Sequence, residues 1–211
     1  MFRKLDEVVD PRHTAVLVID MQNDYCHEEG ALAKQGKRVT ENQAIVPALL
    51  GFLDEARKAG VPVLHVGMQL SDWNMSGPTL ETRTRSKEAV EYPICQAGTW
   101  GSEFYRAVPQ PGEPVVAKHR YSAFIGTDLD TMLRSKGIKT IIVTGVSTNI
   151  CVQSTATDGY MLDYYTVILS DCTAGSSLDA HEAALKNFRI FFGMVATSEE
   201  VVSAWGSKSS S

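Results

Sequence analysis

The run TAVLVI at Thr14–Ile19 is the stretch of this 211-residue chain that decides its fold class. Nearly all of its side chains are apolar, as expected for a strand that is covered on both faces of a sheet. A helix should follow, with Thr40 as its N-cap and an end near Lys58, because apolar residues recur there at helical spacing and Gly60 comes next as a stop. A doubly covered strand followed by an amphipathic helix is typical of α/β proteins.

The same alternation continues to the end of the chain. Further strands are expected at Val61–Val66, Val115–Ala117, Thr140–Thr144, Thr166–Leu169 and Met194–Ala196, and helices near 127–137, 148–161 and 178–192. Strands that alternate with helices predict a parallel sheet with helices on both faces. The predicted fold is therefore a single-domain, three-layer α/β/α architecture with a mostly parallel six-stranded sheet of Rossmann-like topology. This domain should span residues 1–206, and the polar residues 207–211 should be a disordered tail.

One long gap interrupts the pattern, between Gln69 and Pro114. It is rich in Gly, Pro, Thr, Ser and charged residues. A connection of this length in a compact domain is usually functional or disordered. We interpret it as an insertion that builds one wall of a pocket.

Composition excludes several classes of function. The 20 basic and 25 acidic residues give a formal net charge of −5, and no basic run predicts a nucleic-acid partner. No apolar stretch reaches the roughly 20 residues that cross a bilayer, and the first residues lack the apolar core of a signal peptide, so a cytoplasmic protein without membrane contact is expected. The four cysteines form no CxxC pair and should be free thiols.

Three reactive side chains are predicted to lie at strand ends. Asp20 follows the first strand, Lys118 the third, and Cys151 comes after the fourth, at the start of a helix. Ligands of open α/β sheets bind beyond the carboxyl ends of the strands, so these residues should meet at one edge. Cys151 could act as a nucleophile, with Asp20 as its base and Lys118 holding the carboxylate ionised. Each residue alone has an ordinary alternative: a packed thiol, a turn carboxylate or a surface ammonium.

Three motifs carry a family resemblance. They are VIDMQND at 18–24, KHRYSAF at 118–124 and GVSTNICV at 145–152. Together, and in this order, they resemble the isochorismatase-like cysteine hydrolases, and within that group the ureidoacrylate amidohydrolases. The resemblance runs from about Thr14 to Phe192.

The resemblance implies a set of site residues. Asp20, Lys118 and Cys151 would be the catalytic triad. The backbone N–H groups of Ser147 and Cys151 would form the oxyanion hole, with a cis peptide between Val146 and Ser147. The substrate would be bound by aromatic residues in segments that match pocket-lining segments of the family: Tyr25, Trp100, Tyr121 and Phe124. A homodimer or homotetramer would also be expected.

The implied function is cysteine-dependent hydrolysis of a C–N bond in a small amide, ureide or carbamoyl compound. No cofactor is expected. Nicotinamidase relatives carry an Asp-x-His-x-x-His metal motif after the second strand, and residues 65–72 lack it, so we expect no metal and a structural role for His65. Met68 and Leu70 replace polar and aromatic contacts there, which favours a less polar substrate than ureidoacrylate.

Two alternatives stay open. The first is an isochorismatase-type enol-ether hydrolase, against which Cys151 argues, because that position is small and non-nucleophilic in such enzymes. The second is a non-catalytic binding protein on the same fold, since fold does not fix function.

Overall fold

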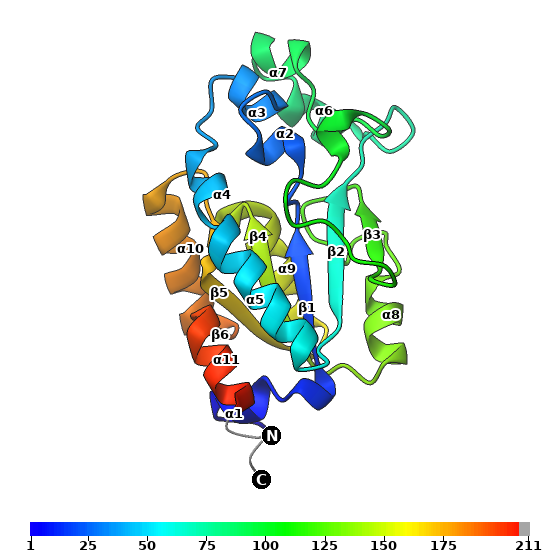
Figure 1. Cartoon of the computed structure of the whole chain (residues 1–211). Helices are drawn as coiled ribbons and strands as arrows, with labels where there is room; N and C mark the ends of the chain where they lie inside the picture. The colour runs from blue at the N-terminus through cyan, green and yellow to red at the C-terminus, as the bar shows by residue number, and fades with distance from the viewer. Residues whose placement is uncertain (207–211) are drawn as a thin grey trace.

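The computed structural model describes residues 1–206; the tail predicted at 207–211 lies outside the described residues. Its centre is a six-stranded sheet in the order β3-β2-β1-β4-β5-β6, and every pairing is parallel (Figure 1). The strands are β1 (Thr14–Ile19), β2 (Val63–Met68), β3 (Val115–Lys118), β4 (Thr140–Val146), β5 (Tyr165–Ala174) and β6 (Met194–Ala196). This is the doubly wound strand order, and it confirms the predicted fold class.

Helices cover both faces of the sheet. The α-helices are α1 (Leu5–Val8), α2 (Asn23–Cys26), α3 (Ala31–Lys34), α4 (Thr40–Ala44), α5 (Val46–Lys58), α6 (Gly77–Arg83), α7 (Lys87–Glu91), α8 (Leu129–Ser135), α9 (Gln153–Met161), α10 (Leu178–Phe191) and α11 (Ser198–Gly206). Short 3-10 turns lie at Pro11–His13 and Trp100–Ser102, and a π-helical turn at Thr148–Val152. Helices α5 and α11 pack together over one face, and α9 lies behind the sheet in Figure 1. Within residues 1–206, no helix is both long and apolar enough to cross a membrane.

The sequence did not lead us to expect α11, although its packing is specific. The ring of Trp205 stacks on Phe52 of α5 with centroids 5.4 Å apart, and its indole N–H donates to the carbonyl of Val9 at 2.7 Å. A buried indole that stacks and also satisfies its N–H is a strong anchor. This anchor closes the layer on that face.

The helix predicted from Thr40 to Lys58 is in fact two helices. Helix α4 ends before Ile45, α5 begins after it, and Thr40 is the first helical residue rather than the N-cap, which is Val39. Pro47 explains the break: it has no N–H to donate, and its ring clashes with the carbonyl four residues earlier. Gly60 lies just past the end of α5 at φ 72°, as its predicted role as a stop requires.

The insertion between Gln69 and Pro114 contains α6, α7 and the Trp100 turn. Figure 1 shows α6 and α7 at the end of the molecule toward which the strand arrows point. Neither helix has a buried residue. The insertion therefore stands over the carboxyl edge of the sheet as a thin, mostly exposed wall.

Candidate active site

Asp20 follows β1 in a left-handed backbone conformation, with φ 51°. Two main-chain hydrogen bonds hold it there: its N–H donates to the carbonyl of Val66 at 2.8 Å, and its carbonyl accepts from Gln22 at 2.8 Å. Such a conformation costs of order 1–3 kcal/mol for a residue other than glycine and persists only where its surroundings enforce it. The carboxylate is completely buried.

Lys118, the last residue of β3, reaches the end of β1 across the intervening β2. Its ammonium lies 2.9 Å from Asp20 Oδ2 and donates to Cys151 Sγ at 3.4 Å and to the carbonyl of Arg120 at 3.1 Å. Lys118 has no exposed surface, and Cys151 is 5% exposed. The structure therefore brings the three predicted residues into contact at the carboxyl edge of the sheet.

Cys151 lies in the π-helical turn that joins β4 to α9. The preceding Val146–Ser147 peptide is cis, as the resemblance implied. Gly145 has φ 95°, and a Cβ there would overlap the carbonyl oxygen of Ile19, so only glycine lets the end of β4 approach the end of β1 this closely. This close approach places the thiol beside Asp20.

Two contacts fix the far side of the same turn. The Asn149 side chain donates to Ser176 Oγ at 3.1 Å and accepts from the Ser176 N–H at 3.0 Å. The hydroxyl of Thr148 lies 2.8 Å from His181 Nδ1 on α10. The turn is thus held by contacts on both sides.

The electrostatics define the protonation of the pair that faces Asp20. Burial first, and then the Asp20 carboxylate, raise the pKa of the Cys151 thiol to about 12, against the lowering effect of Lys118. Burial lowers the pKa of Lys118, but the neighbouring Asp20 and Cys151 raise it by more. The pKa of Lys118 is therefore raised above its ordinary value. At neutral pH the sulfur is therefore a thiol and the lysine an ammonium. Despite the 2.9 Å ionic contact, neither oxygen of Asp20 accepts a well-directed hydrogen bond within residues 1–206, which leaves lone pairs free for a proton.

The residues after Asp20 hold the insertion in place. Gln22 is fully buried, and its side chain donates to the carbonyls of Met68 and Ser102 and accepts from the Met68 N–H. Asp24 accepts from the N–H of Cys95 at 2.6 Å, and Asn23 donates to the carbonyl of Trp100. The motif at 18–24 therefore carries Asp20, the predicted base, and also holds the insertion above it, a second role that the sequence did not reveal.

A cavity of about 380 Å³ lies against the insertion. Its lining residues include Tyr121, Arg83 and Met75. Tyr25 lies deeper: burial, followed by the charges of Cys95, Asp20 and Cys151, raises the pKa of its phenol well above the ordinary value. Tyr25 thus lies near the strand-end cluster and Tyr121 lines the cavity, whose lining includes none of Asp20, Lys118 and Cys151.

The other two aromatic residues have different neighbours. Trp100 is 45% exposed and meets the ring of His27 edge-on, with centroids 5.0 Å apart. Phe124 is buried and stacks on Tyr164, with centroids 5.9 Å apart. Neither belongs to the lining of the 380 Å³ cavity.

Arg83 lines the same cavity, although the sequence did not single it out. Burial lowers its pKa, but Tyr25, Tyr121 and Cys151 raise it more, so all three lie within electrostatic range of the guanidinium. Met68 and Leu70, which were expected to make the pocket less polar, are instead buried in the core at 0% and 1% exposure. That expectation fails because their side chains pack inside the protein.

His65 lies within β2, where its Nε2 is 3.0 Å from Glu113 Oε2 and its side chain is fully buried. This contact joins the strand to the end of the insertion. No group of three or more His, Cys, Asp or Glu side chains suited to a metal ion occurs among residues 1–206.

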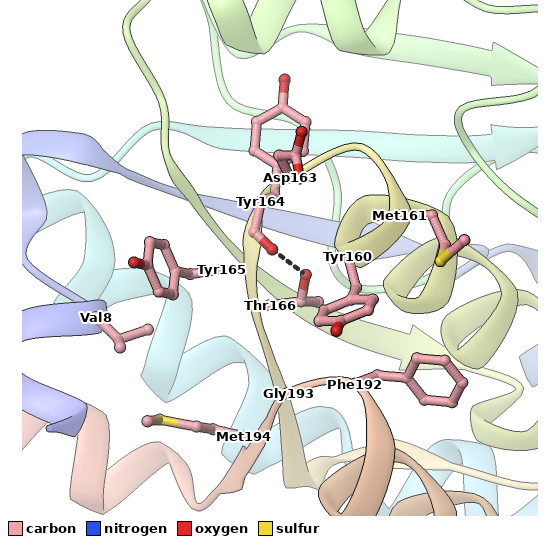
Figure 2. A pocket seen from close by; sticks show the side chains of 10 residues that line it. All are labelled: Val8, Tyr160, Met161, Asp163, Tyr164, Tyr165, Thr166, Phe192, Gly193 and Met194. Carbon is pink, nitrogen blue, oxygen red and sulfur yellow. Dashed lines mark hydrogen bonds between the residues drawn. The ribbon is translucent and has the colours of Figure 1, made fainter. Parts of the chain in front are cut away.

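A larger cavity, of about 680 Å³, opens at the opposite edge of the sheet. Figure 2 shows its lining, which includes Tyr165 and Met194 at the amino ends of β5 and β6, together with Tyr160 and Phe192. None of the three strand-end residues contributes to it. The Asp20-Lys118-Cys151 cluster lies at the carboxyl edge, away from this cavity.

Fold and site together define an α/β protein with a buried Cys-Asp-Lys cluster at the carboxyl edge of its sheet. The isochorismatase domain model matches residues 14–200, and the chain belongs to the isochorismatase family.

Among curated relatives, the ureidoacrylate amidohydrolase of Caulobacter vibrioides is 34% identical over 212 residues, which covers 94% of this chain and 93% of the relative. That of an Enterobacter species is 36% identical over 201 residues, covering 89% and 86%.

Solved structures extend this likeness. A cysteine hydrolase from Pseudomonas syringae pv. phaseolicola superposes with a TM-score of 0.84 at 30% identity and covers 95% of each chain. The N-carbamoylsarcosine amidase of Thermoplasma acidophilum has a TM-score of 0.73 at 28% identity, covering 89% of this chain and 97% of that one.

Proposed function

We propose that the protein is an amidohydrolase that cleaves a C–N bond in a small amide, ureide or carbamoyl compound through a covalent intermediate on Cys151. The observation that carries the proposal is the triple contact of Lys118, 2.9 Å from Asp20 and 3.4 Å from Cys151, in a buried cluster. The family supports the reaction class, because relatives of this length include ureidoacrylate amidohydrolases and an N-carbamoylsarcosine amidase.

Asp20 serves as the base in this mechanism. Because the pKa of Cys151 is raised to about 12, the sulfur cannot rest as a thiolate at neutral pH and must lose its proton as it attacks. Asp20 has free lone pairs beside the thiol and takes that proton. Lys118 keeps its positive charge throughout and stabilises both the carboxylate and the developing thiolate.

The reaction then has two stages. The sulfur adds to the carbonyl carbon, and the N–H groups of Ser147 and Cys151 hold the oxyanion. Asp20 returns its proton to the nitrogen, the C–N bond breaks, and an amine or ammonia leaves a thioester or thiocarbamate on Cys151. Water, deprotonated by Asp20, attacks this intermediate, and the proton returns to the sulfur as the acid product leaves.

The test is the Cys151→Ala variant, assayed for ammonia or amine release on a panel of small amides, ureides and carbamoyl compounds. We expect turnover to fall by about 10⁴-fold or more, because the loss of a nucleophile removes the covalent route. Cys172→Ala is the matched control, since Cys172 is equally buried but its pKa responds to Asp171 and Ser198 rather than to the triad. Undiminished turnover by a folded Cys151→Ala variant would reject the mechanism.

A further inference from the structure

Arg83 is a cation without an anionic partner among residues 1–206, although its guanidinium lies within hydrogen-bond reach of the Tyr25 phenol. It ends α6 and lines the 380 Å³ cavity. Its Nε is buried and has no hydrogen-bond acceptor within the described chain, and none of the ion pairs formed by residues 1–206 includes it. A buried guanidinium nitrogen without an acceptor costs free energy.

Neighbouring arginines show that this state is particular to Arg83. Arg85, two residues further on, donates to both oxygens of Glu81 at 3.0 and 2.8 Å and is 66% exposed. Arg120 donates to the carbonyls of Asn74 and His119. Arg85 is thus paired within the insertion and Arg120 is satisfied by main-chain carbonyls, whereas the Nε of Arg83, which lines the cavity, is buried without an acceptor.

The charges of the site point the same way. Asp20 and Lys118 neutralise each other, and the Cys151 thiol is uncharged at neutral pH. Arg83 adds one positive charge within electrostatic range of the sulfur. Asp72 is the one acidic residue among those that line the cavity; it is exposed and forms no ion pair with Arg83. The lining of the cavity therefore carries one positive charge, the partly buried Arg83, and one negative charge, the solvent-exposed Asp72.

We propose that Arg83 is a specificity-determining residue that binds a carboxylate of the substrate, so that the enzyme selects acidic amides or ureides over neutral ones. The inference rests on the proposed function and names its substrate class. The planar guanidinium can meet both oxygens of a carboxylate and would satisfy the orphaned Nε. The acid end of the substrate then lies under α6, and its scissile carbonyl lies at Cys151.

The first experiment needs no knowledge of the natural substrate. Cys151 is alkylated in parallel with iodoacetate, which carries a carboxylate, and with iodoacetamide, its neutral counterpart, and labelling is followed by peptide mass spectrometry. Both reagents attack the same thiolate fraction, so the ratio of their rates cancels any change in the thiol pKa. The ratio therefore reports how the site treats a carboxylate.

Three variants are compared with the wild type. Arg83→Gln should lower the iodoacetate-to-iodoacetamide ratio by about tenfold, the equivalent of one charge-assisted contact. Arg83→Lys should retain part of the preference for iodoacetate, because lysine keeps the positive charge but cannot bind both oxygens of a carboxylate as the planar guanidinium does. Arg85→Gln is the matched control and should leave the ratio unchanged, since that side chain is already paired with Glu81.

The outcomes separate the two proposals. A ratio that is equal in the wild type and in Arg83→Gln overturns the role of Arg83 and leaves the hydrolase proposal standing. Failure of both reagents to label Cys151, under conditions that label the unfolded chain, overturns both, because the sulfur would then be closed to any ligand.

Turnover and stability provide a second readout. With 3-ureidopropanoate and its methyl ester as probes, Arg83→Gln should raise KM for the acid about tenfold or more and leave the ester nearly unaffected. The same variant should unfold at the same urea concentration as the wild type or at a higher one, because it removes a guanidinium whose buried Nε has no acceptor. If the Arg83→Gln variant is much less stable and hydrolyses the acid and the ester equally poorly, Arg83 is a structural residue instead.

Discussion

The strand-end triad and the insertion above it are built in opposite ways. Asp20 and Lys118 are fully buried, and the elements that carry them are held by main-chain bonds of the sheet. Helices α6 and α7 bury no residue, and the insertion is attached by side chains of residues 22–24 together with a few main-chain bonds, such as that from the Tyr105 N–H to the Met21 carbonyl. We infer from this difference that the proposed catalytic groups lie where the backbone is held most firmly, whereas the proposed substrate selection falls to Arg83, on a helix without buried residues.

The largest effect is expected from breaking the rigid side of this comparison. Lys118→Met leaves Asp20 as a buried charge without its cation, and we expect a loss of about 3–5 kcal/mol of unfolding free energy in urea titrations. Turnover should be lost as well.

A double variant shows whether the pair behaves as a unit. Adding Asp20→Asn to Lys118→Met should recover more than half of the lost stability, because no buried charge then remains, while activity stays absent. If the single and double variants have the same free energy of unfolding, Asp20 and Lys118 are not energetically coupled, and the contrast with the insertion is smaller than we infer.

A pair of glycine substitutions compares the two regions directly. Gly145→Ala must place a Cβ against the Ile19 carbonyl at a φ of 95°, and should cost about 1–3 kcal/mol and displace Cys151. Gly77→Ala, in the first turn of α6, meets nothing within 4 Å and should change stability by no more than about 0.5 kcal/mol. Thermal unfolding and kcat measure both effects, and equal responses would remove the contrast between the regions.

The smallest effect concerns the contact that joins the regions, between His65 and Glu113. Burial, opposed in part by Glu113, lowers the pKa of His65 below 6.5 in the folded state. Below pH 6.5, His65 binds a proton in the unfolded chain but stays neutral in the folded chain. The folded state is therefore favoured fully above pH 6.5, and this contribution of His65 to stability is lost as the pH falls toward the lowered pKa of the folded state.

His181 acts in the same direction, because burial also lowers its pKa. His65→Gln should therefore flatten, but not abolish, the fall of Tm between about pH 7 and pH 5. Glu113 contributes only in a lower window, since its pKa lies below 4.5 despite its burial, chiefly through Arg57. A slope that is identical in wild type and variant would show that His65 titrates normally.

Much of the fold follows from local pattern. β1 and β6 have the predicted bounds, because apolar runs ended there by polar or turn residues leave little choice. β2 starts two residues later than predicted, since the Val61 N–H bonds to Ala56 at the end of α5. β5 continues through Ser170–Ala174, a polar stretch whose extended form depends on tertiary contacts such as Asp171 with Ser198.

The site, too, has a part that follows from local pattern and a part that does not. The triad was predictable because parallel strands bring their carboxyl ends to one edge whatever lies between them. Arg83 was not, because it ends a short, polar helix without apolar periodicity, and its place depends on the long-range contacts of Gln22 and Asp24. A sequence shows an arginine, but only coordinates show that its buried Nε lacks an acceptor.

The clamp made by Gln22, Asn23 and Asp24 has a consequence for how this enzyme can diversify. Its side-chain hydrogen bonds to the insertion end on main-chain groups of Ser102, Trp100 and Cys95, and the one side-chain requirement beside them is glycine at 101, where a Cβ would overlap the Asp24 carboxylate. A segment that follows the same backbone path and keeps this glycine can be seated over an unchanged reaction centre. Exchanging that segment between homologues is thus a direct route to new substrates with the old chemistry intact.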